Sequence, residues 1–268
     1  MNIIELENVS YQYKNEFMAI EQVSCSIEKG EKVAIIGENG AGKTTLAKLM
    51  NGLIKPLSGK VIIDGKSTRG KTAAQMSQIV GYVFQNPDDQ IFNNDVISEI
   101  EYGPKKLNVD PKKMNETIKA IVKLLEIEEY LTENPYNLPF SIRKLVSIAS
   151  ILSMDVDVLV LDEPTAGQDY KGLKILSHLI EFLQNKNKTV ITITHDMEFV
   201  VENFDRIIVM AHKHIITDAS KRSVFWNEEI LSQANIKQPY ISDLAKELKL
   251  GGNVLTISEL ISEFKKIV

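Results

Sequence analysis

Cysteine is nearly missing from this sequence of 268 residues, and long apolar runs are missing altogether. Cys25 is the only cysteine, so an intrachain disulfide is impossible; this suits a reducing compartment and predicts that Cys25 is a small packing residue. No stretch of about 18 apolar residues occurs, so we expect the chain to contact a membrane only through a partner. Glu5 and Glu7 interrupt the apolar residues near the N-terminus, and we expect no signal peptide there.

A strong excess of charge is also missing. The sequence has 31 lysines and arginines against 36 acidic residues, a net charge of −5. This balance gives no electrostatic reason to expect nucleic acid as a partner. The composition, 44% hydrophobic and 25% charged, is that of an ordinary soluble globular protein. The length allows one α/β unit with insertions, or a core with a small appendage.

One glycine-rich stretch fits the phosphate-binding template G-x-x-x-x-G-K-[ST] at every fixed position: Gly37-Glu38-Asn39-Gly40-Ala41-Gly42-Lys43-Thr44. It follows a short apolar run that is typical of a buried parallel strand, and it precedes a segment with helical apolar spacing. Glycines let several backbone N–H groups point at a phosphate, and the N-terminus of the helix attracts the same anion. We expect Lys43 to reach the β- and γ-phosphates of a nucleotide and the Thr44 hydroxyl to bind Mg²⁺. A chance glycine-rich turn is the alternative, which the flanking strand and helix disfavour.

Apolar strands alternate with helical segments along most of the chain, a pattern that predicts a mostly parallel sheet. Two N-terminal segments alternate apolar and polar residues, as in a partly exposed sheet, and Asp64-Gly65 signals a hairpin. Two apolar stripes with helical spacing lie within residues 88–153, and we interpret both as ordinary packing in a mainly helical insertion. The stripes are Ile118, Ile121, Val122 and Leu125, after a cap at Asp110-Pro111, and Leu145, Ile148, Ala149 and Leu152.

Polar side chains follow three of the predicted strands. Asp162 and Glu163 follow one strand, Gln85 follows a second and His195 a third. The C-terminal edge of a parallel sheet is where α/β proteins place ligand contacts. Adjacent carboxylates suit a division of labour in which Asp162 holds Mg²⁺ and Glu163 takes a proton from an attacking water. His195 would contact a γ-phosphate or orient that water, although lone histidines and acidic pairs also occur for purely structural reasons.

Two further motifs have alternative interpretations. An aromatic residue of Tyr11-Gln12-Tyr13 would stack on a nucleobase or pack into the core, and periodicity does not decide between them. His212-Lys213-His214 suggests metal binding, but alternating exposed residues of a strand explain it better.

Taken together, these residues resemble the ATP-binding subunits of ABC transporters over about residues 1–220. The resemblance implies ATP and Mg²⁺ as cofactors and gives each motif a role. Tyr13 matches the aromatic that stacks on adenine, and the nucleotide-binding Walker A loop comprises Gly37, Glu38, Asn39, Gly40, Ala41, Gly42, Lys43, Thr44 and Thr45. The implied catalytic residues are Glu163, His195, Lys43 and Gln85, the implied Mg²⁺ ligands are Thr44, Gln85 and Asp162, and residues 167–169 match the D-loop.

The family resemblance also implies the fold class. It is α/β, with a P-loop NTPase (RecA-like) core of the ABC ATPase type, an antiparallel β-subdomain, a helical insertion and a C-terminal helical tail. We expect the ATPase domain at residues 1–220, its helical subdomain at about 88–153 and the helical appendage at 221–268. Within the appendage, Thr256 and Glu259 are spaced as a capping box.

More narrowly, residues 83–90 resemble the ATPases of energy-coupling-factor (ECF) importers for vitamins and for cobalt or nickel. This resemblance implies an ATP-hydrolysing subunit at the cytoplasmic face of the cell membrane, which energises uptake of a micronutrient through an integral membrane partner. The helical tail suits those subunits, where it aids dimerisation. A soluble ABC ATPase of nucleic-acid repair or translation and an exporter subunit are the alternatives.

The family signature L-S-G-G-Q is degenerate here. Counting back from Asp162 without gaps brings it to Leu138-Pro139-Phe140-Ser141-Ile142, where only the leucine is kept. In the family, one subunit's signature binds the γ-phosphate held by the other subunit's Walker A loop. Pro139 offers neither a hydroxyl nor an N–H group, and Ile142 offers no polar side chain. We therefore expect a heterodimer with a second ATPase subunit whose signature is intact, in preference to a homodimer. An ATP-binding regulatory subunit with little hydrolysis of its own is the alternative.

Overall fold

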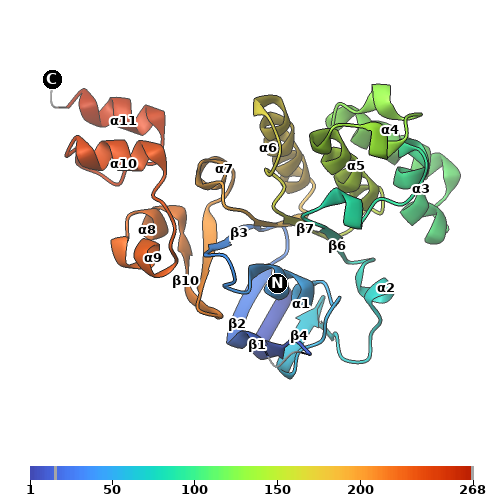
Figure 1. The fold of residues 1–268 in the computed structure, drawn as a ribbon, viewed down its shortest axis with the longest axis horizontal. Coiled ribbons are helices and arrows are strands. Elements are labelled where there is room, and N and C mark those ends of the chain that lie inside the picture. Colours follow the sequence, from blue (N-terminus) through green and yellow to red (C-terminus); the bar gives the residue numbers. More distant parts are fainter. Residues whose placement is uncertain (15–16, 267–268) are drawn as a thin grey trace.

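Two β-sheets lie on either side of helix α1 in the computed structural model, which describes residues 1–14 and 17–266 (Figure 1). The larger sheet has the strand order β10-β9-β3-β8-β7-β6, and its strands are parallel except for the edge strand β10, which is antiparallel to β9. This mixed sheet confirms the expected α/β class. Its strands are β3 (Lys32–Gly37), β6 (Val80–Val83), β7 (Val158–Asp162), β8 (Thr189–Ile193), β9 (Arg206–Ala211) and β10 (His214–Ser220).

The smaller sheet is antiparallel throughout, with the order β2-β1-β4-β5. The expected hairpin at Asp64-Gly65 is confirmed, because both residues have positive φ angles of 49° and 68°, as a two-residue turn requires. Cys25 packs against the core between the two sheets, and burial raises the pKa of its thiol to about 12. The strands are β1 (Asn2–Gln12), β2 (Met18–Glu28), β4 (Ser58–Ile63) and β5 (Lys66–Ser67).

Helices cover the face of the larger sheet that points away from α1, and they bury one continuous apolar core against it. The two predicted stripes belong to this core, so their interpretation as packing is confirmed. The helices are α1 (Lys43–Met50), α2 (Ala73–Met76), α3 (Val96–Lys106), α4 (Pro111–Leu124), α5 (Phe140–Leu152), α6 (Tyr170–Asn185), α7 (Met197–Asn203), α8 (Lys221–Phe225), α9 (Glu228–Gln233), α10 (Tyr240–Glu247) and α11 (Ile257–Phe264). Three short 3₁₀ helices complete the described chain: η1 (Pro87–Asp89), η2 (Glu128–Tyr130) and η3 (Pro135–Asn137).

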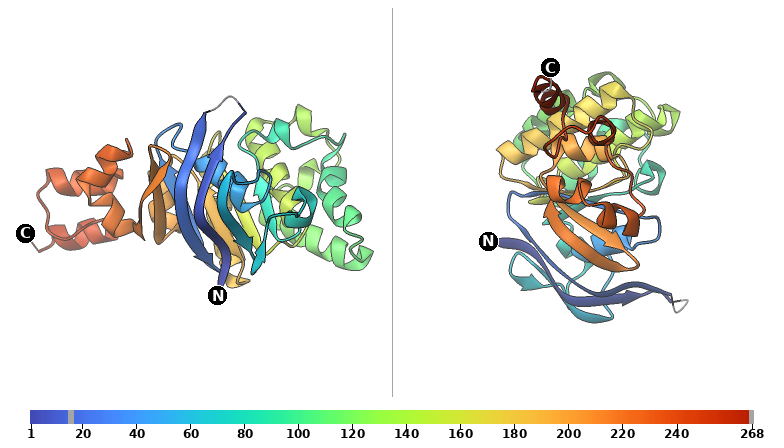
Figure 2. Two further views of the ribbon diagram at one scale, coloured as in Figure 1. Left: turned by 90° about the horizontal axis from the view of Figure 1, so that it is seen from below. Right: turned by 90° about the vertical axis from the view of Figure 1, so that its left-hand side faces the viewer.

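The helical segments gather at the two ends of the molecule. Helices α3–α5 lie on one side of the sheets, and α8–α11 lie on the opposite side, beyond β10 (Figures 1 and 2). The expected capping box of α11 is confirmed, because the Thr256 hydroxyl accepts from the Glu259 N–H and the Glu259 carboxylate accepts from the Thr256 N–H. Among residues 1–14 and 17–266, no helix has both the length and the apolar character needed to cross a bilayer.

The interpretation of residues 212–214 as alternating strand residues is wrong for two of the three. Strand β9 ends at Ala211, and His212 and Lys213 adopt positive φ angles of 49° and 72° before β10 begins at His214. These angles are those of a two-residue hairpin turn, which alternation in the sequence did not reveal. In the described part of the chain, no cluster of three potential metal-binding side chains is found.

Candidate nucleotide-binding site

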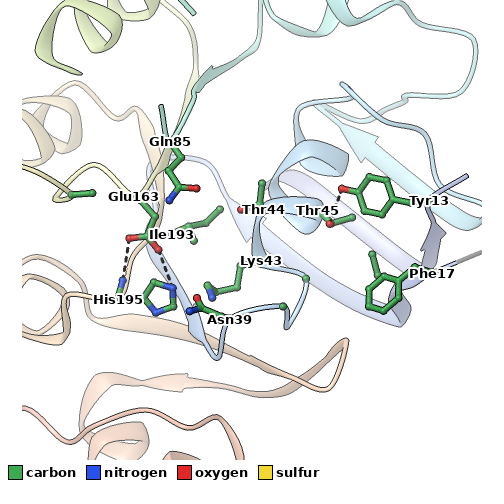
Figure 3. Close-up of a pocket in the computed structure, with 14 residues that line it drawn as sticks. Tyr13, Phe17, Asn39, Lys43, Thr44, Thr45, Gln85, Glu163, Ile193 and His195 are labelled. Atoms are coloured by element: carbon green, nitrogen blue, oxygen red, sulfur yellow. Dashed lines mark hydrogen bonds and ion pairs between the residues drawn. The ribbon is translucent and has the colours of Figure 1, made fainter. Parts of the chain in front are cut away.

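A cavity of about 590 Å³ opens at the C-terminal edge of the parallel strands (Figure 3). It collects side chains and loop residues from β1, the loop before α1, and the ends of β6, β7 and β8. Most of the expected site residues line it: Tyr13, Asn39, Gly40, Gly42, Lys43, Thr44, Thr45, Gln85, Glu163 and His195. The other four, Gly37, Glu38, Ala41 and Asp162, lie beneath or beside this lining, in the loop and at the end of β7.

Close packing explains two of the loop glycines. Gly37 has a φ angle of 149°, and a Cβ atom there would lie 2.0 Å from the Met210 carbonyl oxygen on β9. Gly42 has a φ angle of 101°, and a Cβ atom there would lie 2.5 Å from the carbonyl oxygen of Ala19. Substitution at either position therefore forces the backbone out of place. The loop is held tightly between β2 and β9, and α1 begins directly after it with its N-terminus facing the cavity.

Lys43 lies across the phosphate-binding loop. Its Nζ donates to the carbonyl oxygens of Gly37 and Glu38, both at 2.9 Å. Burial lowers the pKa of this ammonium, and the nearby carboxylates Glu163, Asp162 and Glu38 offset part of that effect. A phosphate in the loop would place a further negative charge beside Lys43 and favour its charged form.

Thr44 and Asp162 bring two oxygen donors together at the edge of the cavity. The Thr44 Oγ1 lies 3.4 Å from Asp162 Oδ1, and Asp162 Oδ2 accepts a hydrogen bond of 2.6 Å from the Tyr82 hydroxyl. Burial and Asp162 raise the pKa of Tyr82, so it stays a neutral phenol that can donate. Hydroxyl and carboxylate oxygens are ligands that Mg²⁺ prefers, so these residues fit that ion. The amide of Gln85 points into the same cavity (Figure 3).

Glu163 and His195 are joined by two contacts. His195 Nε2 lies 3.2 Å from Glu163 Oε1, and the His195 backbone N–H donates to Oε2 at 3.3 Å. Burial raises the pKa of Glu163 to about 6, and Asp162 adds to this; the His195 N–H, Lys43 and Lys144 act in the opposite direction. Burial and Lys43 lower the pKa of His195, against the effect of Asp162. At neutral pH the pair is therefore a carboxylate that accepts a hydrogen bond from the Nε2–H of a neutral imidazole.

The two tyrosines of the Tyr11-Gln12-Tyr13 motif have different surroundings. Tyr11 packs at the edge of the core between the sheets. The Tyr13 ring is 38% exposed and lines the cavity, where its hydroxyl lies 3.1 Å from Thr45 Oγ1. Phe17, which sequence reasoning missed, lies near Tyr13 at the same end of the cavity (Figure 3). Two aromatic rings therefore lie at one end of the cavity, on the far side of Lys43 from Glu163 and His195 (Figure 3).

Comparison with known proteins identifies the family of this site. The family model described as "ABC transporter" matches residues 20–166, which is more than half of the chain. The chain belongs to the ABC transporter family. This is a family of ATP-hydrolysing proteins, so the expected P-loop fold and enzyme class are confirmed, and the relatives' names include ECF transporter subunits.

Three relatives of this ABC protein are informative. An energy-coupling factor transporter ATP-binding protein, EcfA, of Methanoculleus marisnigri is 35% identical, over 99% of this chain and 96% of its own. The structure of CbiO1 from Clostridium perfringens, described as part of the ABC transporter complex cbiONQ, has a TM-score of 0.77 at 31% identity and covers 91% of this chain and 99% of its own. The ABC transporter cassette MJ0796, a dimer bound to ADP and Pi, has a TM-score of 0.73 at 26% identity, over 81% of this chain and 98% of its own. The chain spans only 43% to 46% of the length of three other relatives that it matches.

The degenerate signature of this ABC protein lies at the start of α5. Pro139 precedes the helix and provides no side-chain cap, and the helix begins at Phe140. The Phe140 ring packs against Gly167, where a Cβ atom would lie 2.7 Å from it. The Ser141 carbonyl oxygen accepts from Gln168 Nε2 at 3.1 Å. Gly167 and Gln168, which match the D-loop in sequence, are therefore packed against the signature segment of the same chain.

Lys144 is a second residue that sequence reasoning missed. It lies on α5 with no exposed surface, and its Nζ donates to the main-chain carbonyl oxygen of Gln85. Burial lowers the pKa of Lys144 to about 8, although Asp162 and Glu163 raise it in part. Its position four residues before the buried Ile148 was the available signal, because that spacing places a lysine on the apolar face of the helix.

Proposed function

We propose that this chain binds and hydrolyses Mg²⁺-ATP as one ATPase subunit of an ECF-type importer. One observation supports the chemistry above all others: Lys43, Thr44, Glu163 and His195 line a single cavity, with Asp162 bonded to Thr44 at its edge. A phosphate-binding loop, a metal-binding pair and an oriented carboxylate are the parts that hydrolysis of a nucleoside triphosphate requires.

In the proposed reaction, Glu163 accepts a proton from the attacking water, and His195 keeps the carboxylate turned toward that water. Lys43 and the N–H groups of the loop and of α1 bind the β- and γ-phosphates and stabilise the charge that develops on them. Mg²⁺ bound by Thr44, Asp162 and Gln85 would neutralise phosphate charge. Tyr13 would stack against the adenine, and Thr45, whose Oγ1 lies 3.1 Å from the Tyr13 hydroxyl, would bind the nucleotide beside it.

The partners in this proposal are a second ATPase subunit and an integral membrane subunit. The names of EcfA and CbiO1, each part of a transporter, support this assignment. The chain then works at the cytoplasmic face of the cell membrane and energises uptake of a vitamin or a transition-metal ion. In this proposal, residues 1–220 bind and hydrolyse the nucleotide, and residues 88–153 within them transmit its state to the membrane partner. Residues 221–268 support association of the subunits.

The test is Glu163→Gln in the chain co-purified with the subunits encoded beside it. Because the amide cannot accept the proton, we expect ATP turnover to fall by at least about 100-fold. Binding of a fluorescent ATP analogue should persist, because the phosphate-binding loop is unchanged. Glu116→Gln, on the exposed face of α4, is the matched control and should keep full turnover. Equal turnover in the Glu163 variant and the wild type would refute the role of Glu163.

A regulatory subunit that binds ATP and hardly hydrolyses it is the second candidate. It is favoured by Pro139 and the Phe140 ring at the start of α5, where a γ-phosphate from a partner would need N–H and hydroxyl donors. The Glu163→Gln experiment separates the two candidates: with a regulatory subunit, the turnover of the complex comes from its ATPase partner and stays unchanged in the variant.

A further inference from the structure

A buried lysine connects the signature helix to Gln85, a residue that lines the nucleotide cavity. Lys144 has no exposed surface, and its Nζ reaches out of α5 to the main-chain carbonyl oxygen of Gln85, directly after β6. The amide of Gln85 points into the nucleotide cavity (Figure 3). Lys144 itself does not line that cavity, so it can affect a nucleotide there only through Gln85 or through its charge, which also acts on Asp162 and Glu163.

The rest of this segment is fastened to α5 by a different residue. Gln90 accepts a hydrogen bond from the Phe84 N–H at 3.1 Å, and its amide donates to the Ser147 carbonyl oxygen at 2.7 Å and to Ser150 Oγ at 3.1 Å. Gln90 thus fixes the two ends of residues 84–90 on the helix. The contact at Gln85 itself comes from Lys144.

Stability alone does not account for a lysine at this position. Removing an ammonium group from water is costly, and an apolar side chain of similar volume is often as good or better in a protein interior. Among the described residues, Lys144 has no ion-pair partner: its Nζ donates one hydrogen bond, to a neutral carbonyl, and lies 5.7 Å from the centroid of the Phe140 ring. A role in holding Gln85 explains why the charge is placed there.

We infer that Lys144 is a positioning residue, which holds the main chain of Gln85 so that its amide meets the γ-phosphate and its bound Mg²⁺. The inference rests on the proposed function, because it concerns the same cavity. It also couples α5, whose first turn is the signature segment, to the γ-phosphate site of the same chain. Without Lys144, Gln85 would still line the pocket, but its main chain would no longer be held by a hydrogen bond from α5, so its amide would be less well positioned.

The experiment compares binding of a non-hydrolysable Mg²⁺-ATP analogue with binding of Mg²⁺-ADP by calorimetry on the purified full chain. In Lys144→Met we expect affinity for the triphosphate to fall about tenfold, the value of one or two hydrogen bonds, while ADP changes less than about twofold. Lys221→Met is the control, because Lys221 also donates to a main-chain carbonyl oxygen, that of Val201, but far from the cavity. It should leave both affinities unchanged.

A double-mutant cycle with Gln85→Ala tests whether Lys144 acts through Gln85. In the Gln85→Ala background, Lys144→Met should cost no further triphosphate affinity, because the amide that it positions is already gone. A further loss there would assign Lys144 a direct electrostatic effect, and an equal loss for ATP analogue and ADP would assign it a general structural role; either overturns the inference. Lys144→Gln, too short to reach the carbonyl, is measured in parallel and should show the same selective loss if the methionine variant does not fold. A wild-type chain that binds neither nucleotide would instead refute the proposed function.

Discussion

Glu163 combines an unusual backbone with an unusual side-chain environment. Its φ angle is 48°, and its N–H donates to the Ile193 carbonyl oxygen at 2.8 Å, so the residue turns sharply out of β7 toward the cavity. There its carboxylate is buried beside Asp162, with one oxygen near His195 Nε2. A carboxylate in such a place binds a proton more readily than a solvated one does. Its ionised form is poorly solvated and therefore lowers the stability of the fold.

That cost predicts a pH-dependent stability of the nucleotide-free protein. The pKa of Glu163 is raised from 4.5 to about 6, so the folded state binds its proton more tightly than the unfolded state does. The penalty for ionising Glu163 is therefore absent below its unfolded pKa, grows as the pH rises through this window, and is complete above the folded pKa. We expect Glu163→Gln to be more stable than the wild type by about 1–2 kcal/mol at pH 8, and by little at pH 4.5.

Thermal unfolding at both pH values, in buffer with a chelator, checks this prediction. Glu116→Gln controls for the loss of one surface charge and should follow the wild type at each pH. A Glu163→Gln variant that is less stable than the wild type at pH 8 would contradict the account, since it would mean that the ionised carboxylate is well solvated or well paired.

The sequence was sufficient to predict the site residues that belong to a motif of fixed spacing. It was insufficient for residues that reach the site only because distant segments pack together. Lys43 and Thr44 follow from the glycine template, because the loop itself dictates their places. Tyr82 and Lys144 do not, since each contacts the site only after β6 and α5 have packed against β7 and the Gln85 segment. A tyrosine in a buried strand gives no local sign of its partner. The spacing of Lys144 to Ile148 indicates a place on the apolar face of the helix, but not the contact with Gln85.

At the scale of elements, one arginine ties both sheets together. Arg206, the first residue of β9, donates to both Glu31 oxygens at 2.9 and 2.8 Å and to both Asp218 oxygens at 2.8 and 2.6 Å. It also donates to the Ser26 carbonyl oxygen on β2 at 2.8 Å. These contacts raise the pKa of Arg206 and join β2, β9 and β10 below the phosphate-binding loop.

Loss of this arginine should be costly. Arg206→Met leaves two half-buried carboxylates without their shared partner, and we expect a loss of about 2–4 kcal/mol in the free energy of unfolding at pH 7. Urea unfolding measures it. The control is Lys60→Met, because the pair of Lys60 with Glu7 is exposed at 3.5 Å, and such pairs contribute less than about 1 kcal/mol. Losses of similar size in the two variants would show that the Arg206 network adds nothing beyond a surface pair.

The existence of each helix and strand was easier to predict than the residues at which it begins and ends. The buried strands β7 and β8 and the stripes of α4 and α5 follow from apolar periodicity, because burial on a fixed face leaves a repeating pattern. The turn at His212-Lys213 was missed, since its left-handed backbone depends on the pairing of β9 with β10 and neither residue is a typical turn former.

At the scale of the molecule, this chain has two parts of an ABC ATPase site: the Walker side, which carries the phosphate-binding loop, and the signature side at the start of α5. The Walker side has all of the expected residues, and the signature side does not. The Walker side brings Lys43, Asp162, Glu163 and His195 together within one chain. The signature side offers Pro139, Phe140 and Ile142 where, in the proposed dimer, a partner's γ-phosphate would need donors. The sequence revealed this departure directly, but the partner that completes the site leaves no mark in one chain.

The proposed heterodimer gives the final prediction. Two copies of this chain would form two damaged sites, so the lone chain should hydrolyse Mg²⁺-ATP slowly at any protein concentration. Repair of the signature by Pro139→Ser, Phe140→Gly, Ser141→Gly and Ile142→Gln restores hydroxyl and N–H donors to the start of α5. Since each charge-assisted bond contributes about 1.5–3 kcal/mol, we expect ATP turnover by the repaired chain to rise by about tenfold or more.

Two controls accompany this measurement. The rate per chain should rise with concentration as dimers form, and Glu163→Gln added to the repaired chain should abolish the gain. Brisk turnover by the unrepaired lone chain would show instead that Ser141 and the existing backbone donors are enough, and that a second kind of ATPase subunit is not required.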